Sequence, residues 1–166
     1  METGNTSSGD DTSDHPAAHP SAADPPAAHP PDPALDTPGV RRIPTTAPWA
    51  ASVGYSRALR FGPHMLVSGT APVNEDGSTF APGDAHGQTR RCIEIIEHAL
   101  RELGGNLSQV VRTRVYVTDI SRWEEIGRAH GAAFGANPPV TTLVEVRALI
   151  SPDMLVEIEA EAWAPH

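Results

Sequence analysis

The segment 138–163 alternates apolar and polar residues with a period of two, which is the pattern of β-strands. Around Pro152 the alternation stops, so we expect two strands joined by a turn. In the first strand the alternation separates two sets, which are Val140, Thr142, Val144 and Val146, and Thr141, Leu143, Glu145 and Arg147. In the second strand it separates Met154, Val156, Ile158, Ala160 and Ala162 from Leu155, Glu157, Glu159, Glu161 and Trp163.

The three glutamates of the second strand are the most informative feature of this pattern. Successive positions on one strand face are ~7 Å apart, so Glu157, Glu159 and Glu161 repel one another unless cations such as Arg147 reach them. A strand face open to water also carries glutamate, and that reading stays open. Because apolar residues share this face, we interpret it as partly buried, against a ligand or another subunit.

Five further elements are expected upstream, in the order strand, strand, helix, strand, helix. They cover 55–61, 64–70, 84–103, 110–118 and 121–134. Gly62 and Pro63 favour a hairpin turn between the first two strands, and Ser121 and Glu124 have the spacing of a capping box.

This order predicts an α+β fold, in which two helices cover one face of a sheet. The other face then carries charged and aromatic residues, namely Arg112, Arg114, Tyr116, Glu145, Glu157 and Glu159. Since this chain offers no further helix to cover that face, we expect a closed homo-oligomer with its sites between chains.

Composition divides the chain of 166 residues into two parts. Residues 1–40 are rich in Ala and Pro and contain seven of the 21 acidic residues but no Arg. Such a segment cannot bury enough apolar surface to offset the entropy of ordering, so we expect a disordered acidic tail over 1–40 and one folded domain over 41–166. The domain keeps 14 acidic residues against 12 Arg. That balance argues against a nucleic-acid partner.

Several classes of chemistry and location are disfavoured by what the chain lacks. It has no Lys, which argues against Schiff-base catalysis and a P-loop, and its single cysteine, Cys92, cannot form an internal disulfide. Without a long apolar run or a signal peptide, we expect a cytoplasmic protein that has no membrane partner. The histidines at 15, 19 and 29 are interpreted as low-complexity residues. Neither a metal nor a cofactor is therefore expected.

Two polar residues lie on the apolar stripes of the predicted helices. Cys92 is interpreted as a small core residue, because no catalytic motif surrounds it. His130 is interpreted as a satisfied or interfacial histidine and is kept as a candidate substrate contact at a subunit boundary.

The order and spacing of several short motifs resemble those of the RidA/YjgF family, whose members are also labelled reactive intermediate deaminases or L-PSP endoribonucleases. The motifs are the run Val67-Ser68-Gly69-Thr70-Ala71-Pro72-Val73-Asn74, Asp119 with the helix after it, Pro139 with Val144-Glu145-Val146, and Val156-Glu157-Ile158-Glu159-Ala160. The resemblance covers about residues 44–163. It implies a mixed sheet of the chorismate-mutase-like type, assembled as a homotrimer with three clefts between subunits.

The resemblance also implies site residues. The family's tyrosine falls on Tyr55, its serine on Ser68 beside Gly69, and the glutamate that places the hydrolytic water on Glu157. These positions imply a catalytic role for Glu157 and substrate-binding roles for the others.

Three positions depart from the family pattern. Thr141 stands where active deaminases carry the arginine that holds a substrate carboxylate, Leu143 replaces a cysteine, and Gly127 replaces an asparagine. Thr141 and Leu143 are kept as substrate-binding positions. A threonine hydroxyl cannot form the bidentate charged pair that arginine makes with a carboxylate, so specificity is expected to differ.

The favoured function is therefore a hydrolase or deaminase acting on a small imine, enamine or related metabolite in clefts between subunits. The alternative is a noncatalytic trimer that binds a small metabolite or has a regulatory role. Ribonuclease activity is disfavoured, because the domain is nearly neutral and has no stripe of aromatic and basic residues.

Overall fold

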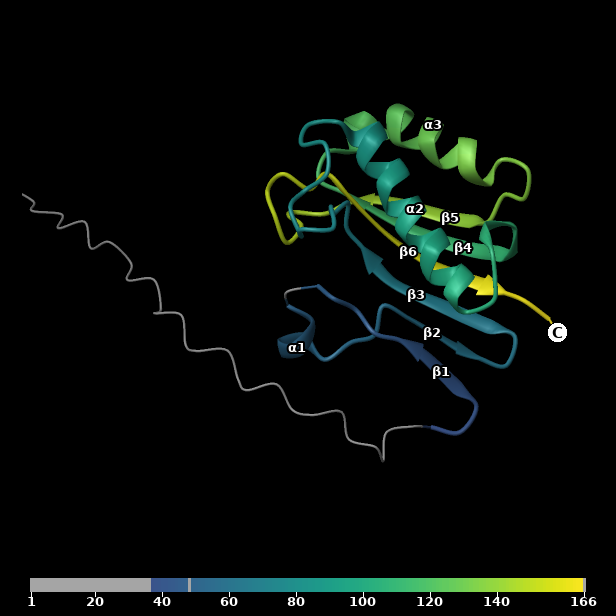
Figure 1. The fold of residues 1–166 in the computed structure, drawn as a ribbon. Helices are drawn as coiled ribbons and strands as arrows, with labels where there is room; N and C mark the ends of the chain where they lie inside the picture. Colours follow the sequence, from purple (N-terminus) through teal and green to yellow (C-terminus); the bar gives the residue numbers. More distant parts are fainter. Residues whose placement is uncertain (1–36, 48, 166) are drawn as a thin grey trace, which may run out of the picture.

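The structure, a computed structural model, describes residues 37–47 and 49–165 (Figure 1). The predicted disordered tail lies outside the described residues except for its last four positions. The boundary between tail and domain therefore stays a prediction, although the first strand begins at Val40.

The described chain alternates strands and helices. The strands are β1 (Val40–Ile43), β2 (Ala58–Phe61), β3 (His64–Thr70), β4 (Val110–Val117), β5 (Val140–Glu145) and β6 (Val156–Trp163). The α-helices are α1 (Ala50–Val53), α2 (Ala85–Glu102) and α3 (Trp123–Phe134), and two 3₁₀ turns span Leu107–Gln109 and Ile120–Arg122. The predicted order is thus confirmed, while β1 and α1, each of four residues, were not predicted.

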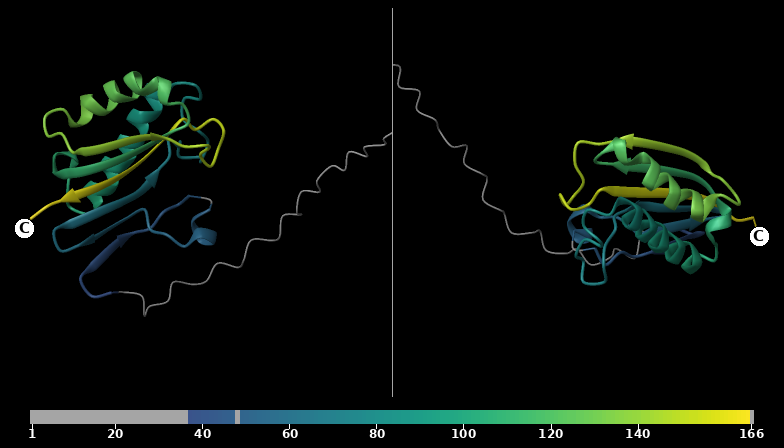
Figure 2. Two further views of the ribbon diagram at one scale, coloured as in Figure 1. Left: turned by 180° about the vertical axis from the view of Figure 1, so that it is seen from behind. Right: turned by 90° about the horizontal axis from the view of Figure 1, so that it is seen from above.

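The strands form one sheet in the order β1-β2-β3-β6-β4-β5. β5 runs parallel to β4, and the other neighbouring pairs are antiparallel, so the sheet is mixed. Helices α2 and α3 lie side by side on one face of it, and the view from behind shows the opposite face without a helix (Figure 2). The α+β prediction is confirmed.

The core forms where the helices pack on this face. Met65, Val115 and Ile158 come from three adjacent strands, and Ile96 and Leu100 come from α2, all almost fully buried. Cys92 is buried in the same cluster, as predicted, and burial raises the pKa of its thiol. A raised thiol pKa removes the thiolate that a nucleophile needs.

The face without helices carries the predicted charges of β4 and β6, and several of them pair between these two strands. The prediction was wrong for Glu145, which lies beside Val117 of β4 on the helix side. Arg114 on β4 forms ion pairs with Glu159 and, at 3.3 Å, with Glu161 on β6. Arg112 lies 4.0 Å from Glu161. The repulsion expected along β6 is therefore relieved by arginines of the neighbouring strand β4.

The prediction was wrong about which side of β5 meets the helices. Parallel pairing places Thr141 beside Thr113 and Leu143 beside Val115, and both β4 residues are buried on the helix side. Leu143 accordingly packs against the core, whereas Val140 is 64% exposed. Alternation defines two faces of a strand, but the pairing of β5 with β4 decides which one is covered.

The predicted capping box was also wrong. Asp119, two residues before Ser121, accepts a hydrogen bond from the Ser121 backbone N–H at 2.9 Å and begins a 3₁₀ turn. Glu145 adds a bond from the Ile120 N–H to its carboxylate, also 2.9 Å. Because these carboxylates satisfy the exposed N–H groups, Ser121 does not cap, and α3 begins only at Trp123.

No helix in the described part of the chain is long and apolar enough to cross a bilayer.

Candidate functional site

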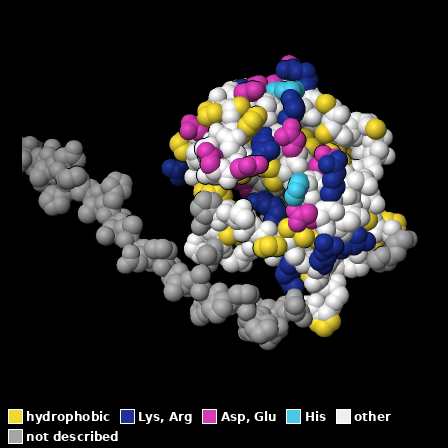
Figure 3. Space-filling view, in the orientation of Figure 1, with side chains coloured by type: hydrophobic (Ala, Val, Ile, Leu, Met, Phe, Trp, Pro, Cys, Tyr) yellow, Lys and Arg dark blue, Asp and Glu magenta, His cyan; other side chains and the backbone are white. Residues whose placement is uncertain are grey.

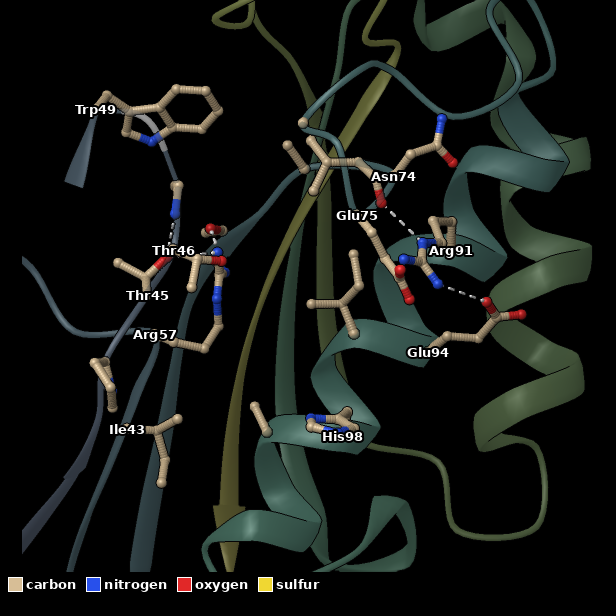
Figure 4. Close-up of a pocket in the computed structure, with 18 of the residues that line it drawn as sticks. Ile43, Thr45, Thr46, Trp49, Arg57, Asn74, Glu75, Arg91, Glu94 and His98 are labelled. Carbon is tan, nitrogen blue, oxygen red and sulfur yellow. Dashed lines mark hydrogen bonds and ion pairs between the residues drawn. The ribbon is translucent and has the colours of Figure 1, made fainter.

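A groove of about 700 Å³ separates α2 from the N-terminal strands. One wall comes from the segment between β1 and β2, including Trp49 and Tyr55. The other comes from α2 and the loop before it, and Figure 4 shows side chains of both walls facing the space between them. In the space-filling view a hollow opens between these parts of the molecule (Figure 3). Gly69 of β3 and Glu157 of β6 complete the lining.

Glu157 fits into the groove only because residue 69 is a glycine. The pairing of β3 with β6 shifts register between Val67 and Thr70, so β3 is irregular where it passes Glu157. A Cβ on residue 69 would overlap Glu157 Oε1. The glycine predicted as a substrate contact is thus the residue that leaves room for the carboxylate.

The environment of Glu157 favours its protonated form. Burial raises its pKa above the ordinary 4.5, and the negative charge of Glu159 raises it further, while Arg57 acts in the opposite direction. A carboxyl group with a raised pKa exchanges protons more readily near neutral pH, as a general acid or base requires.

The two arginines that line the groove are held by other parts of the protein. Arg57 donates to the Gly69 carbonyl at 3.4 Å and to the Thr70 hydroxyl at 3.2 Å. Arg91 donates from Nε to the Val73 carbonyl at 2.9 Å and lies 3.6 Å from Glu94. Their guanidinium groups therefore organise the walls of the groove.

The aromatic pair at the entrance is joined by a hydrogen bond. The Trp49 indole N–H donates to the Tyr55 hydroxyl at 3.0 Å, which leaves the Tyr55 O–H available as a donor. Ser68 lies next to the groove rather than in its lining, and its hydroxyl donates to the Ser56 carbonyl at 2.7 Å. Ser68 thus ties β3 to the segment before β2 that carries Tyr55 and Arg57.

A second polar group, which we call the edge cluster, consists of Thr113, His130 and Thr141. Thr113 Oγ1 lies 2.9 Å from His130 Nε2 and 2.9 Å from Thr141 Oγ1. Since the Thr141 hydroxyl donates to the Pro139 carbonyl at 3.3 Å, Thr113 donates to Thr141 and the His130 Nε2–H donates to Thr113.

The edge cluster carries no positive charge at neutral pH. Burial lowers the pKa of His130, whose ring also packs against Phe134 at 4.6 Å between centroids. Leu143 lies on the same side of β5, directly beyond Thr141 in the alternation, and adds only apolar surface.

The predicted site residues therefore fall into two groups within one chain. Tyr55, Gly69 and Glu157 line the groove, with Ser68 adjoining it. Thr141, Leu143 and His130 lie at β5 and α3, at the other end of the sheet order. Strand β4 stands between β6, which carries Glu157, and β5. The chain alone does not bring the two groups together.

Among the described residues, no cluster of His, Cys, Asp and Glu side chains is arranged to hold a metal ion.

Comparison with known proteins identifies the family. The family described as Endoribonuclease L-PSP matches residues 45–164, which is most of the chain. The chain belongs to this family. Its mixed sheet with two helices fits the solved structures of this family.

Relatives of known sequence and structure agree with this assignment. A crystal structure of Rv2704 from Mycobacterium tuberculosis, described as a member of the YjgF/YER057c/UK114 family, is 46% identical, with a TM-score of 0.68 over 75% of this chain and 99% of that one. The uncharacterized protein SCO2049 of Streptomyces coelicolor is 33% identical over 78% of this chain and 96% of its own length. The 3-aminoacrylate deaminase RutC of Acinetobacter baylyi is 33% identical over 65% of this chain and 85% of its own.

Sequence reasoning missed the walls of the groove. Trp49 precedes a helix of only four residues, and no periodic pattern marks it. Arg91 and His98 belong to the polar side of α2, which looked like an ordinary solvated face. A mixture of arginine, histidine and glutamate on one helix flank was the available signal, but it does not show that the N-terminal strands lie opposite.

Replacing Gly69 with alanine should displace Glu157 while leaving the fold intact. The added methyl group meets the flexible end of a side chain, so we expect the free energy of unfolding to change by less than about 1 kcal/mol. Any activity or ligand binding that depends on Glu157 should fall as far as it does in Glu157→Gln. Gly131→Ala, where nothing lies within 4 Å of the added Cβ, is the control. Full function in Gly69→Ala would contradict the proposed fit.

Glu157 should also make stability depend on pH. Its pKa is raised in the folded state, so its favourable contribution is complete below the unfolded-state value near 4.5 and is lost as pH rises through the folded-state pKa. Glu157→Gln removes this loss. The variant should therefore gain melting temperature relative to the wild type as pH rises from about 4 to 7, measured by thermal denaturation. A constant difference across this range would show that the carboxyl group titrates normally.

Proposed function

We propose that this protein is a hydrolase or deaminase of small imines, enamines or related metabolites, acting in clefts between the subunits of a homotrimer. The observation that carries the proposal is the division of the site into two groups of residues that are separated by β4 within one chain. In a ring of subunits, the groove of one chain meets the edge cluster of the next, and one cleft then contains all the predicted residues. The name of the relative RutC, a 3-aminoacrylate deaminase, supports the reaction class.

The sheet face without helices supports assembly. It exposes apolar side chains among its ion pairs, including Leu66, Val140 and Val144. Contact with sister chains removes this surface from water, and the charges are already paired between β4 and β6.

The proposed reaction assigns the central step to Glu157. Its carboxylate accepts a proton from water as the water oxygen attacks the carbon of a protonated C=N bond, whose π electrons pass to the nitrogen. The Glu157 carboxyl group then returns that proton to the nitrogen, which makes it a leaving group. The resulting carbinolamine loses ammonia, with cleavage of the C–N bond and formation of a carbonyl group. Tyr55 donates a hydrogen bond to the substrate, and the irregular strand around Ser68 and Gly69 leaves space for both water and substrate.

Substrate choice in this proposal follows from Thr141 and Leu143. A neutral hydroxyl that already donates to the Pro139 carbonyl replaces the charged clamp for a carboxylate. Loss of a charged hydrogen bond costs ~1.5–3 kcal/mol, or roughly ten- to a hundredfold in binding. Generic 2-imino acids are accordingly poor substrates.

The side chains at positions 141 and 143 also favour a second candidate function, that of a noncatalytic trimer that binds a metabolite. The hydroxyls of Thr113 and Thr141 are occupied by one another, and Leu143 offers no chemistry. Saturable binding in the cleft without turnover of the bound compound distinguishes this candidate from the enzyme. For either candidate function, we also propose that the protein is cytoplasmic and has no nucleic-acid or membrane partner.

Substitution of Glu157 tests the enzymatic proposal. Glu157→Gln should lower kcat on a panel of imines and enamines by about 100-fold or more, the usual contribution of a general acid or base. Ammonia release measures the rate. Glu97→Gln provides a matched control, since Glu97 pairs with Arg101 on the exposed side of α2. If no panel member is hydrolysed, or if Glu157→Gln turns over normally, the enzymatic proposal fails.

The assembly is tested by its mass in solution. Sedimentation equilibrium at micromolar concentration should give three times the chain mass of 17.6 kDa. Val144→Arg places a charge on the proposed interface and should shift the protein towards monomer, whereas Ala132→Arg, on the exposed side of α3, should not. A folded wild-type monomer under these conditions would remove the shared cleft.

A further inference from the structure

We infer that the groove takes a ligand whose anchoring group is a positively charged amine or iminium attached to an apolar body, and that it disfavours carboxylates. This inference rests on the proposed function only for the location of the site. It is carried by the cavity, the charges that line it, and the partners those charges already have.

Acidic side chains outnumber basic ones in the groove. Five carboxylates line it against two guanidinium groups and one histidine; the carboxylates are Glu75, Asp76, Glu94, Glu102 and Glu157. Because the walls exclude part of the solvent, this imbalance acts on a bound ligand more strongly than it would on an open surface. A ligand carboxylate entering the groove meets a net negative field.

Neither arginine is free to compensate. Arg57 is bound to Gly69 and Thr70, and its second terminal nitrogen donates to the Thr45 hydroxyl at 3.4 Å. Arg91 is bound to the Val73 carbonyl and is neutralised by Glu94 at 3.6 Å. To bind a ligand carboxylate, either arginine must break hydrogen bonds or ion pairs that stabilise the groove wall. This loss cancels much of the binding free energy gained from the ligand.

In the part of the chain that the structure describes, three of the five carboxylates have no cation of their own, and one of these, Asp76, accepts hydrogen bonds from Ser78 instead. Within the described residues, neither Glu75 nor Glu157 lies within 4.0 Å of an arginine or histidine nitrogen, and neither side chain has a hydrogen-bond partner in the protein. Glu157 is also half-buried, so it is the group that gains most from a cationic partner. In Figure 4, Glu75 extends into the space between the two walls.

The remaining lining suits the apolar body of such a ligand. Trp49 and Tyr55 provide aromatic surface, and Ile43 and Ile95 provide aliphatic surface from opposite walls. Aromatic rings attract an ammonium group through cation–π contacts and also pack against hydrocarbon. A cavity of about 700 Å³ holds a molecule well above the size of a three-carbon metabolite.

Benzylamine and benzoate form a matched pair of probes, because they share a phenyl ring and carry opposite charges near pH 7. Binding to the full-length protein is measured by isothermal titration calorimetry at low ionic strength. Benzylamine should bind at least about tenfold more tightly than benzoate, a difference of about 1.4 kcal/mol. Benzoate binding as tightly as benzylamine, or no binding of either probe, would overturn the inference.

Substitutions of groove residues test whether the preference for benzylamine arises in the groove. The double variant Glu75→Gln/Glu94→Gln should reduce the ratio of the two affinities at least about threefold, since it removes an unpaired carboxylate and releases Arg91. The control Glu97→Gln/Glu124→Gln makes the same change in net charge outside the groove and should leave the ratio unaltered. If both double variants change the ratio equally, the preference arises from overall charge and the inference fails.

This outcome is separable from that of the proposed function. Hydrolysis of the imine panel combined with a preference for benzoate leaves the enzymatic proposal standing and removes the charge selection. Preference for benzylamine without any hydrolysis keeps the charge selection and removes the enzyme.

Discussion

The structure depends on β6, a central strand whose two sides meet entirely different surroundings. Ile158 and Ala160 face the helices and belong to the core, whereas Glu157, Glu159 and Glu161 alternate with them on the other side. Helices α2 and α3 cover only the apolar side of β6. The carboxylates lie on the other side, where each needs its own ion pair, hydrogen bond or solvent. A strand with this pattern cannot shift by one residue without burying three charges in the core.

The three glutamates have different interactions because the residues beside them differ. Glu159 and Glu161 lie beside β4, which supplies Arg114 and Arg112 as ion-pair partners. Glu157 lies at the irregular part of β3, where the missing side chain of Gly69 leaves a space in place of a partner. The carboxylates of Glu159 and Glu161 therefore stabilise the sheet through ion pairs, whereas the carboxylate of Glu157 is left without such a partner.

Much of this arrangement could be predicted from the sequence, and the exceptions share a physical reason. Strong periodicity predicted β3, β4, β6 and α2, and the motif around Glu157 indicated a carboxylate that lines the groove. The covered face of β5 could not be predicted, because alternation is symmetric until the pairing of Thr141 with Thr113 assigns a side. The groove is lined both by Trp49 and by residues far along the chain, such as Glu94 and Glu157, and a local pattern carries no signal for that arrangement. The capping box did not form because Asp119 accepts the Ser121 backbone N–H, the donor that Glu124 would bind in such a box.

The position of Thr141 links the fold to the charge of the cleft. In the proposed trimer, the edge cluster contributes hydroxyl groups and an imidazole whose pKa burial lowers, so it brings no cation to the groove of the next chain. The electrostatic field in the cleft is then determined by the groove itself, where both arginines are engaged and Glu157 is not. An arginine at position 141 would add a positive charge to each cleft. In the proposed trimer, the side chain at position 141 on β5 therefore contributes to the choice between anionic and cationic ligands.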